Sequence, residues 1–298
     1  WKPPIPQNKS TKRINNIFQS TVIKLNGGSK VELNKILNRV VSILKEVDEG
    51  ITRNDVPTNK KKNSYIPSIG SAKETIFVKK VMETWVKKYP SELPGIIVQK
   101  ASKKCLNGCL EVPYEEGYWR GKKADIALTT NSYVGENDTE WIIEIKKFEA
   151  VGDAGGKHPG QEAAIAKLLS PWPMSSGLLY DVKKINSHHK GERKAVIMYG
   201  FSLDLSTIEH ARNHPRNQEE MQPGRECNRA ENLDGILKSN DYQPISFIEL
   251  LDDFERSCES RGLQISKRYH STFENLKVHP IYTKGDIVAW EVYPRRED

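Results

Sequence analysis

Hydrophobic side chains recur at helical spacing in the first third of the chain. Residues 29–47 carry them in an i, i+3, i+4, i+7 pattern that predicts an amphipathic helix, at Leu33, Ile36, Leu37, Val40, Val41, Leu44 and Val47. Ser29 and Glu32 have the spacing of a capping box at its start. A second capping box, from Ser71 to Glu74, predicts a helix that continues to about Lys88 and buries Val78, Val81, Met82 and Trp85.

The rest of the chain alternates strand-like and helical patterns. Two apolar runs, "KADIALTT" and "TEWIIEIKKF", predict a β-hairpin over residues 122–150, and "KAVIMYGFS" predicts a buried strand over 194–202. Helices are expected over 159–170, in "SSGLLYDVKKINSH" and in "SFIELLDDFERSCES", which a third capping box from Ser246 to Glu249 opens. The C-terminal segment is predicted to form strands joined by a turn at "KGD", residues 284–286.

This order of elements predicts an α/β fold with a mixed central sheet flanked by helices. We expect residues 1–65 to form an N-terminal arm and helical region. Residues 66–298 would form the core, with insertions at about 203–245.

The hairpin carries charge where strand interiors normally exclude it. Side chains alternate between the faces of a strand, so Ile142, Glu144 and Lys146 share one face of "WIIEIKKF", while its other face is mostly apolar and belongs to a core. Asp125 begins the preceding strand and would approach Glu144 across an antiparallel pair. Two neighbouring carboxylates raise the pKa of one of them unless a cation neutralises the pair, and Mg²⁺ prefers such oxygen ligands. The hairpin is therefore either a metal site with an assisting lysine or the solvated face of an ordinary sheet.

The context of the hairpin favours the metal site. An acid followed two residues later by lysine occurs three times, at Glu144/Lys146, Asp181/Lys183 and Glu192/Lys194. The second pair lies in a predicted helix, where positions i and i+2 point apart, and the third lies in a basic turn. Only the first lies in a strong strand pattern and follows a strand that carries an acid.

These residues resemble the core of the PD-(D/E)xK nuclease superfamily, to which many type II restriction endonucleases belong. The resemblance rests on "KADIAL" followed by "WIIEIKKF", although Ala124 stands where the family often has proline. It implies a restriction-endonuclease-like core in which Asp125 and Glu144 bind Mg²⁺, with Mn²⁺ as a substitute, and Lys146 is catalytic. It also implies hydrolysis of double-stranded DNA to 5′-phosphates by a homodimer in a prokaryotic cell.

Two further residues are candidates for a supporting role at this site. Glu74 would reach it from the helix that begins near Ser71, although a capping box already accounts for that glutamate. Gln161 would reach it from the helix after the glycine-rich loop, although polar residues are common in the first turn of a helix. Zinc is not favoured, because Cys105 and Cys109 have no second pair at ligand spacing.

The charge of the chain suggests a polyanionic partner. Lysine and arginine exceed the acids by 46 to 39, which gives a net charge of +7 and a pI near 9.0. The polar stretch 203–230 contains arginine, asparagine and glutamine, which read bases, but its glutamates equally fit a salt-bridged surface segment. The candidate DNA-binding residues are Lys183, Lys184, Lys190, Arg212, Arg216, Arg225 and Arg229.

Cysteine usage and hydropathy indicate the setting. The four cysteines are too few for a disulfide scaffold, and no apolar run has the length of a membrane helix or a secretory signal, so we expect a cytoplasmic protein without membrane contact. The function expected is a sequence-specific, metal-dependent endonuclease. The alternatives are a repair, junction-resolving or RNA-directed nuclease of the same fold, or a catalytically inactive nucleic-acid-binding module.

Overall fold

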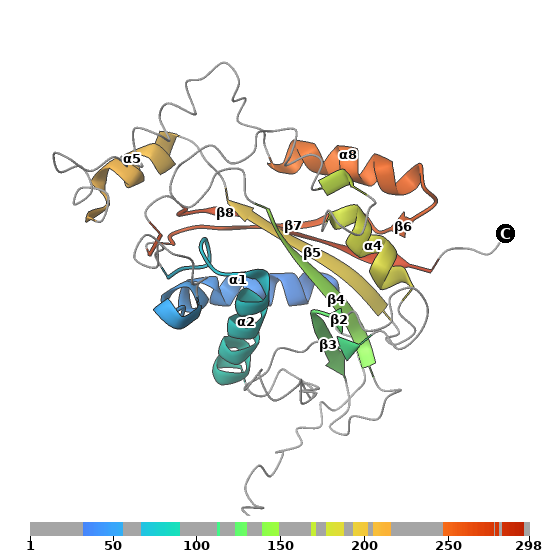
Figure 1. Cartoon of the computed structure of the whole chain (residues 1–298), viewed down its shortest axis with the longest axis horizontal. Coiled ribbons are helices and arrows are strands. Elements are labelled where there is room, and N and C mark those ends of the chain that lie inside the picture. Colours follow the sequence, from blue (N-terminus) through green and yellow to red (C-terminus); the bar gives the residue numbers. More distant parts are fainter. Residues whose placement is uncertain are drawn as a thin grey trace, which may run out of the picture.

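The structure is a computed structural model of the whole chain (Figure 1). It describes residues 32–55, 67–89, 112–113, 123–129, 139–148, 168–170, 177–187, 193–201, 205–215, 247–276, 278–279 and 282–294.

A mixed β-sheet forms the centre of the molecule. Strands β3 (Ile126–Thr129), β4 (Thr139–Phe148), β5 (Arg193–Phe201) and β8 (Gly285–Tyr293) lie in that order. Only β4 and β5 are parallel; β3 runs antiparallel to β4, and β8 antiparallel to β5. Strands β6 (Gln264–Ile265) and β7 (Tyr269–Phe273) both pair with β8, and a separate two-stranded ladder joins β1 (Val112–Pro113) to β2 (Lys123–Ala124). The predicted hairpin and the predicted strand at 194–202 are therefore confirmed.

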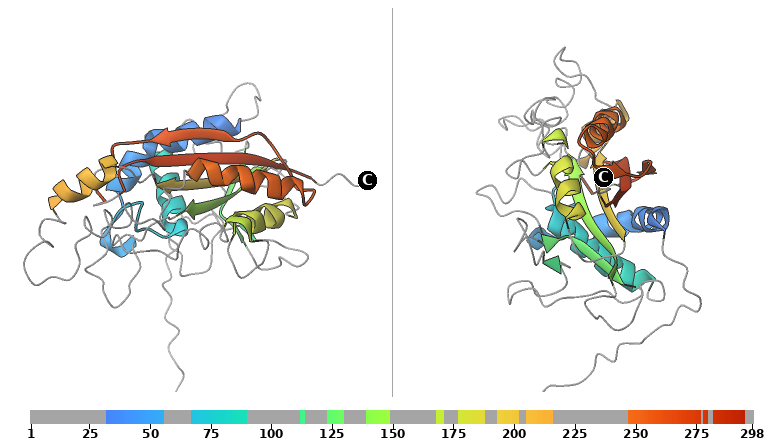
Figure 2. Two further views of the ribbon diagram at one scale, coloured as in Figure 1. Left: turned by 90° about the horizontal axis from the view of Figure 1, so that it is seen from above. Right: turned by 90° about the vertical axis from the view of Figure 1, so that its right-hand side faces the viewer.

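Helices cover both faces of the sheet (Figure 2). On one face, α1 (Leu33–Glu49) and α2 (Glu74–Lys88) pack against Trp141, Ile143 and Ile145. On the other, α4 (Leu178–Asn186) and α8 (Phe247–Glu259) pack against Ile142, Val196 and Trp290. This arrangement confirms the prediction of a mixed α/β sheet flanked by helices. Two shorter elements complete the described chain, η1 (Arg53–Asp55) and α5 (Leu205–Asn213), and α5 extends beyond the end of the sheet opposite α4 (Figure 1).

Strand β4 is buried on both faces because it lies inside the sheet and between two helical layers. Every side chain from Glu140 to Phe148 is buried. The segment that contains α4 connects β4 to its parallel neighbour β5, as a parallel pair requires. The predicted core face is confirmed, but the alternative of a solvated face at Glu144 and Lys146 is wrong, since only 3% and 9% of these two residues are exposed.

The predicted helix starts need correction. The N-cap of α2 is Lys73, so Glu74 is its first helical residue rather than the third residue of a capping box, and Ser71 hydrogen-bonds with Ser68 instead. Likewise, Glu32 is the N-cap of α1, and its side chain makes no capping hydrogen bond. Both helices begin later than predicted, which frees the Glu74 carboxylate for other contacts.

The predicted turn at "KGD" is also wrong. Gly285 and Asp286 begin β8 and pair with Phe201 and Gly200 of β5. A Cβ atom added at Gly285 would lie 2.0 Å from the carbonyl oxygen of Gly200, so glycine is required there by the close approach of two strands.

Other predictions fall partly or wholly outside the described residues. The helix predicted over 159–170 is described only as helical at residues 168–169, and residues 1–31 and 216–246 are outside the described ranges. No helix among the residues described is both long enough and apolar enough to cross a membrane.

Candidate active site

The predicted acidic pair lies where β3 meets β4. The ladder pairs Ile126 with Ile143, and the same register continued by one residue brings Asp125 beside Glu144. The main-chain N–H of Ile145 donates to Oδ2 of Asp125 over 2.8 Å, which holds this carboxylate against β4. The sequence prediction that the two acids meet across an antiparallel pair is therefore confirmed.

Burial makes both acids reluctant to ionise. Burial raises the pKa of Asp125 to about 6, partly offset by the Ile145 N–H and the Lys184 ammonium group. Burial and the neighbouring Asp125 raise the pKa of Glu144 well above its usual value, and Lys184 opposes that rise. The nearby positive charge therefore compensates the two carboxylates only in part.

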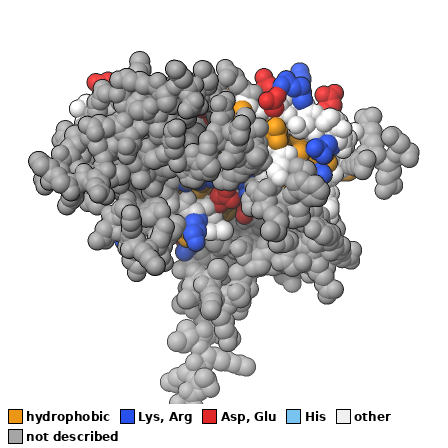
Figure 3. Space-filling model, turned by 45° about the horizontal axis from the view of Figure 1, so that its top comes forward, with side chains coloured by type: hydrophobic (Ala, Val, Ile, Leu, Met, Phe, Trp, Pro, Cys, Tyr) orange, Lys and Arg blue, Asp and Glu red, His pale blue; other side chains and the backbone are white. Residues whose placement is uncertain are grey.

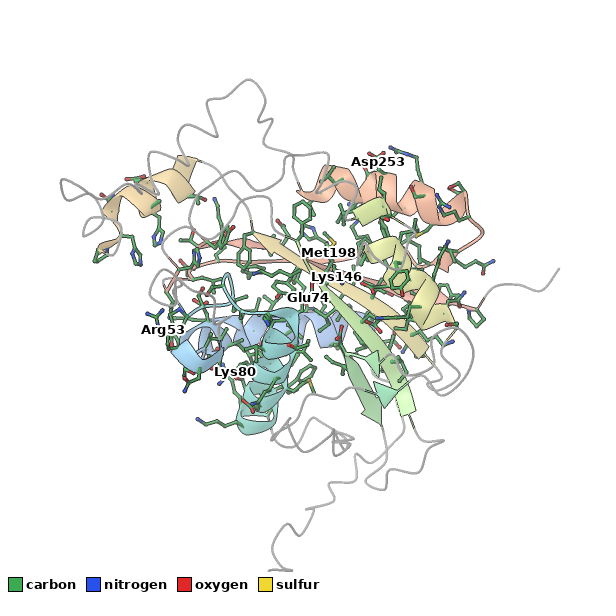
Figure 4. The ribbon with its side chains drawn as sticks, viewed as in Figure 1. Arg53, Glu74, Lys80, Lys146, Met198 and Asp253 are labelled. Atoms are coloured by element: carbon green, nitrogen blue, oxygen red, sulfur yellow. The ribbon has the colours of Figure 1, made fainter. Side chains whose placement is uncertain are left out.

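Lys146 points from the same face of β4 toward two other carboxylates. Its Nζ lies 3.0 Å from Oδ2 of Asp181 on α4 and 3.5 Å from Oε2 of Glu74 on α2. Burial opposes the charge on this lysine, but Asp181 and Glu74 outweigh that effect and raise the pKa of Lys146. Figure 4 shows Glu74 and Lys146 close together near the start of α2.

Glu74 is fixed by the backbone of β4 as well as by Lys146. Its Oε1 accepts a hydrogen bond from the main-chain N–H of Lys147 over 3.0 Å. Glu74 is the first residue of α2, so this hydrogen bond joins the start of the helix to β4. The structure thus brings this predicted supporting residue to the site.

Sequence reasoning missed Asp181 and assigned Lys184 elsewhere. Asp181 is 3% exposed and lies on α4 among Leu178, Val182 and Ile185, the helix's apolar residues. Lys184, for which a DNA contact was predicted, lies 2.7 Å from Oε2 of Glu144 and 3.4 Å from Oδ1 of Asp181. The signal in the sequence was an acid at a position where an amphipathic helix normally has an apolar residue. A carboxylate is rarely buried at such a position unless a charged group pairs with it.

Together these six side chains form one charged network, which comprises Asp125, Glu144, Asp181, Glu74, Lys146 and Lys184. When all are ionised, four carboxylates face two ammonium groups, which leaves two negative charges uncompensated. Exposure rises along the network, from 4% for the Glu144 side chain to 32% for that of Glu74. In the space-filling view, acidic side chains lie beside lysine or arginine side chains in a hollow near the middle of the face (Figure 3).

The donor set fits a hard divalent cation. Asp125 and Glu144 supply carboxylate oxygens, and the excess of two negative charges equals the charge of one Mg²⁺ ion. Within the described ranges, no three His, Cys, Asp or Glu residues form a ready metal-binding group. Lys184 holds an oxygen of Glu144 that such an ion would share.

The remaining predicted site residues lie outside this network. Lys183 lies on α4, half-buried, next to Lys184. Arg212 belongs to α5, at the far end of the sheet (Figure 1). Gln161, Lys190, Arg216, Arg225 and Arg229 are outside the described residues.

Comparisons of the chain with protein-family models, with curated proteins and with solved structures found no match.

Proposed function

We propose that this protein is a divalent-metal-dependent endonuclease that hydrolyses phosphodiester bonds of double-stranded DNA. The observation that carries the proposal is the pair formed by half-buried Asp125 and buried Glu144, with Lys146 on the same face of β4. A buried group of acids with perturbed pKa values is costly to a fold, and such groups concentrate at functional sites. The sequence resemblance to PD-(D/E)xK nucleases supports the same assignment, including the restriction-endonuclease-like core.

Each residue has a chemical task in this proposal. Asp125 and Glu144 hold Mg²⁺, which when bound acidifies a water molecule and offsets charge on the phosphate. Lys146 remains protonated because Asp181 and Glu74 raise its pKa, so it acts as a fixed positive charge beside the scissile phosphate rather than as a base. Glu74 and Asp181 position that ammonium group through direct ion pairs.

The charge of the chain supports a nucleic acid as substrate. A net charge of +7 favours association with a polyanion. We further propose a sequence-specific enzyme of the type II restriction class that acts as a homodimer and leaves 5′-phosphates. These finer assignments rest on the sequence resemblance.

One observation favours a second candidate function. Both lysines of the network are paired with its acids, and Lys184 contacts the acid that would bind metal. A network whose acids are already paired with lysines also fits a catalytically inactive nucleic-acid-binding module. The two candidates differ in whether Mg²⁺ produces cleavage.

A plasmid-cleavage assay separates these candidates. Supercoiled plasmid with MgCl₂ is expected to give linear fragments that EDTA abolishes and that Glu144→Gln does not produce. Glu291→Gln is the matched control, because Glu291 is also a buried glutamate paired with a basic residue, Arg193, but lies outside the network. Discrete fragments would support sequence specificity, whereas cleavage only of RNA or branched DNA would favour the other nucleases. Binding without cleavage would favour the inactive module, and full activity in Glu144→Gln would reject the site.

A further inference from the structure

Lys184 makes the contact that a metal ion would make. Its Nζ lies 2.7 Å from Oε2 of Glu144, and its side chain is 12% exposed. The second carboxylate within its reach is that of Asp181, three residues earlier on the same helix, with 3.4 Å between Nζ and Oδ1. Lys146, in contrast, pairs with Asp181 and Glu74. The two lysines therefore share Asp181, and each has one further partner, Glu144 for Lys184 and Glu74 for Lys146.

A divalent cation and the Lys184 ammonium group compete for Glu144. Mg²⁺ binds carboxylate oxygens at roughly 2.1 Å, so an ammonium group that stayed at its present distance from Oε2 would lie within a few ångströms of the ion. Two positive charges at that separation in a buried site repel strongly. An ion that shares this oxygen with Lys184 is therefore bound more weakly than an ion that has it alone.

Asp181 offers Lys184 an alternative partner without any change in the backbone. Because the two residues are separated by three positions on α4, their side chains are neighbours on the helix surface. Leaving Glu144 for Asp181 keeps the lysine paired. The transfer does not change the charge of the network, which is neutral once the ion is bound, because two lysines and one divalent ion balance four carboxylates.

We propose that Lys184 is a resident counter-ion of the site, which neutralises Glu144 in the metal-free protein and transfers to Asp181 when a divalent cation binds. This inference rests on the proposed function, because it takes Asp125 and Glu144 as the metal ligands. In this role Lys184 is a positioning residue. It preserves the acidic site in the absence of metal, at the cost of weaker metal binding.

Mn²⁺ binding, measured by isothermal titration calorimetry on the full chain without DNA, tests the inference. Lys184→Met is expected to lower the Kd for Mn²⁺ about tenfold or more, because a buried competitor is removed. Lys184→Arg keeps the charge, and Lys183→Met removes a charge from the adjacent position. The Kd of Lys184→Arg for Mn²⁺ is expected to stay within about threefold of that of the unaltered protein, because the charge is kept. The Kd of Lys183→Met should also stay within about threefold, because solvent screens the more exposed charge of Lys183.

A second pair of variants keeps the test decisive if Lys184→Met does not fold. Asp181→Asn removes the alternative partner and should weaken Mn²⁺ binding, whereas Asp181→Asn combined with Lys184→Met should bind more tightly than Asp181→Asn alone. A merely structural role for Lys184 predicts unchanged or weaker binding when this lysine is removed, and that result would overturn the inference. If the unaltered protein and Glu144→Gln both fail to bind Mn²⁺, the proposed metal site itself fails, which is a distinguishable result.

Discussion

The two faces of β4 are equally buried but chemically opposite. Glu144 and Ile145 are neighbours in sequence, and each is 3% exposed. Ile145 packs with Trp141 and Ile143 against α1 and α2, in an apolar core. Glu144 faces the other way, into the network that α4 completes. Burial alone therefore does not distinguish a structural face from a candidate site.

The energetics of the two faces differ accordingly. Removing apolar surface from water stabilises a fold by about 25 cal/mol per Å². A buried ion pair often stabilises a fold no better than apolar residues of similar volume would, and it becomes strongly unfavourable when one partner is lost. The apolar face is thus explained by folding, whereas the charged face is better explained by function.

Two adjacent lysines repeat this contrast at closer range. Lys146 pairs with the acids of the network, while Lys147 donates from its Nζ to the main-chain carbonyls of Gly70 and Ala72, the latter over 3.4 Å. Both lysines are buried. Lys147 fastens the segment before α2 to the sheet, which is a structural task.

The largest expected effect separates these two lysines. Lys146→Met should reduce DNA cleavage by roughly 100- to 1,000-fold, because a fixed charge beside the phosphate is lost. Lys147→Met should leave cleavage within about tenfold and lower the free energy of unfolding by about 1–3 kcal/mol, because two carbonyl groups lose a donor. Cleavage rates at a temperature where circular dichroism shows both variants folded, together with urea denaturation, provide the measurement. Equal losses of activity would mean that the two faces are not functionally distinct.

A second pair of variants compares two aspartates on opposite faces, half-buried Asp125 and buried Asp48. Burial raises the pKa of Asp125 and of Asp48 alike to about 6, but Asp48 belongs to α1 and accepts a hydrogen bond from the Ile69 N–H over 2.8 Å. MgCl₂ at about 100 times its Kd should stabilise the unaltered protein by about 2.7 kcal/mol. Asp125→Asn should abolish that stabilisation, and Asp48→Asn should retain it. Thermal unfolding with and without MgCl₂ checks this, and a retained shift in Asp125→Asn would remove this residue from the metal site.

The fold and the hairpin were predictable because the spacing of apolar residues, which determines the buried face of a helix or strand, is a local property of the sequence. Strand alternation placed Glu144 and Lys146 on one face, and the antiparallel pair brought Asp125 to them. The helix starts were less predictable. Ser71 had a closer partner in Ser68, so Glu74 did not cap α2 and instead joined the site.

The contribution of α4 could not be obtained from spacing within the motif. Asp181 and Lys184 reach the hairpin only because β4 and β5 are parallel, which places the connecting helix over Glu144. The rule that residues i and i+2 diverge on a helix was correct for Asp181 and Lys183, but the relevant pair was i and i+3. Tertiary packing, not the local motif, completed the network.

The pH dependence of stability tests the apolar face separately. Unfolded aspartate titrates near 3.8 and Asp48 in the folded chain near 6, so between these values the folded state binds more protons. The free energy of unfolding should therefore fall as pH rises through this window, by about 1.4 kcal/mol per pH unit for one such group. Asp48→Asn should remove that part of the slope in urea denaturation from pH 4 to 6, and an unchanged slope would contradict the raised pKa.

The smallest expected effect compares two glutamates of α2. Glu74 lies 3.5 Å from the Lys146 ammonium group, whereas Glu83 pairs with Lys79 over 3.8 Å on the exposed side of the helix. Glu74→Gln keeps an acceptor for the Lys147 N–H but removes a charge that raises the pKa of Lys146. Cleavage should fall by about three- to tenfold, because the Lys146 ammonium group loses one of the two carboxylates that position it. Glu83→Gln should leave cleavage unchanged. Glu74→Gln added to Lys146→Met should cause no further loss, and a further loss would mean that Glu74 orders the start of α2 and does not act through Lys146.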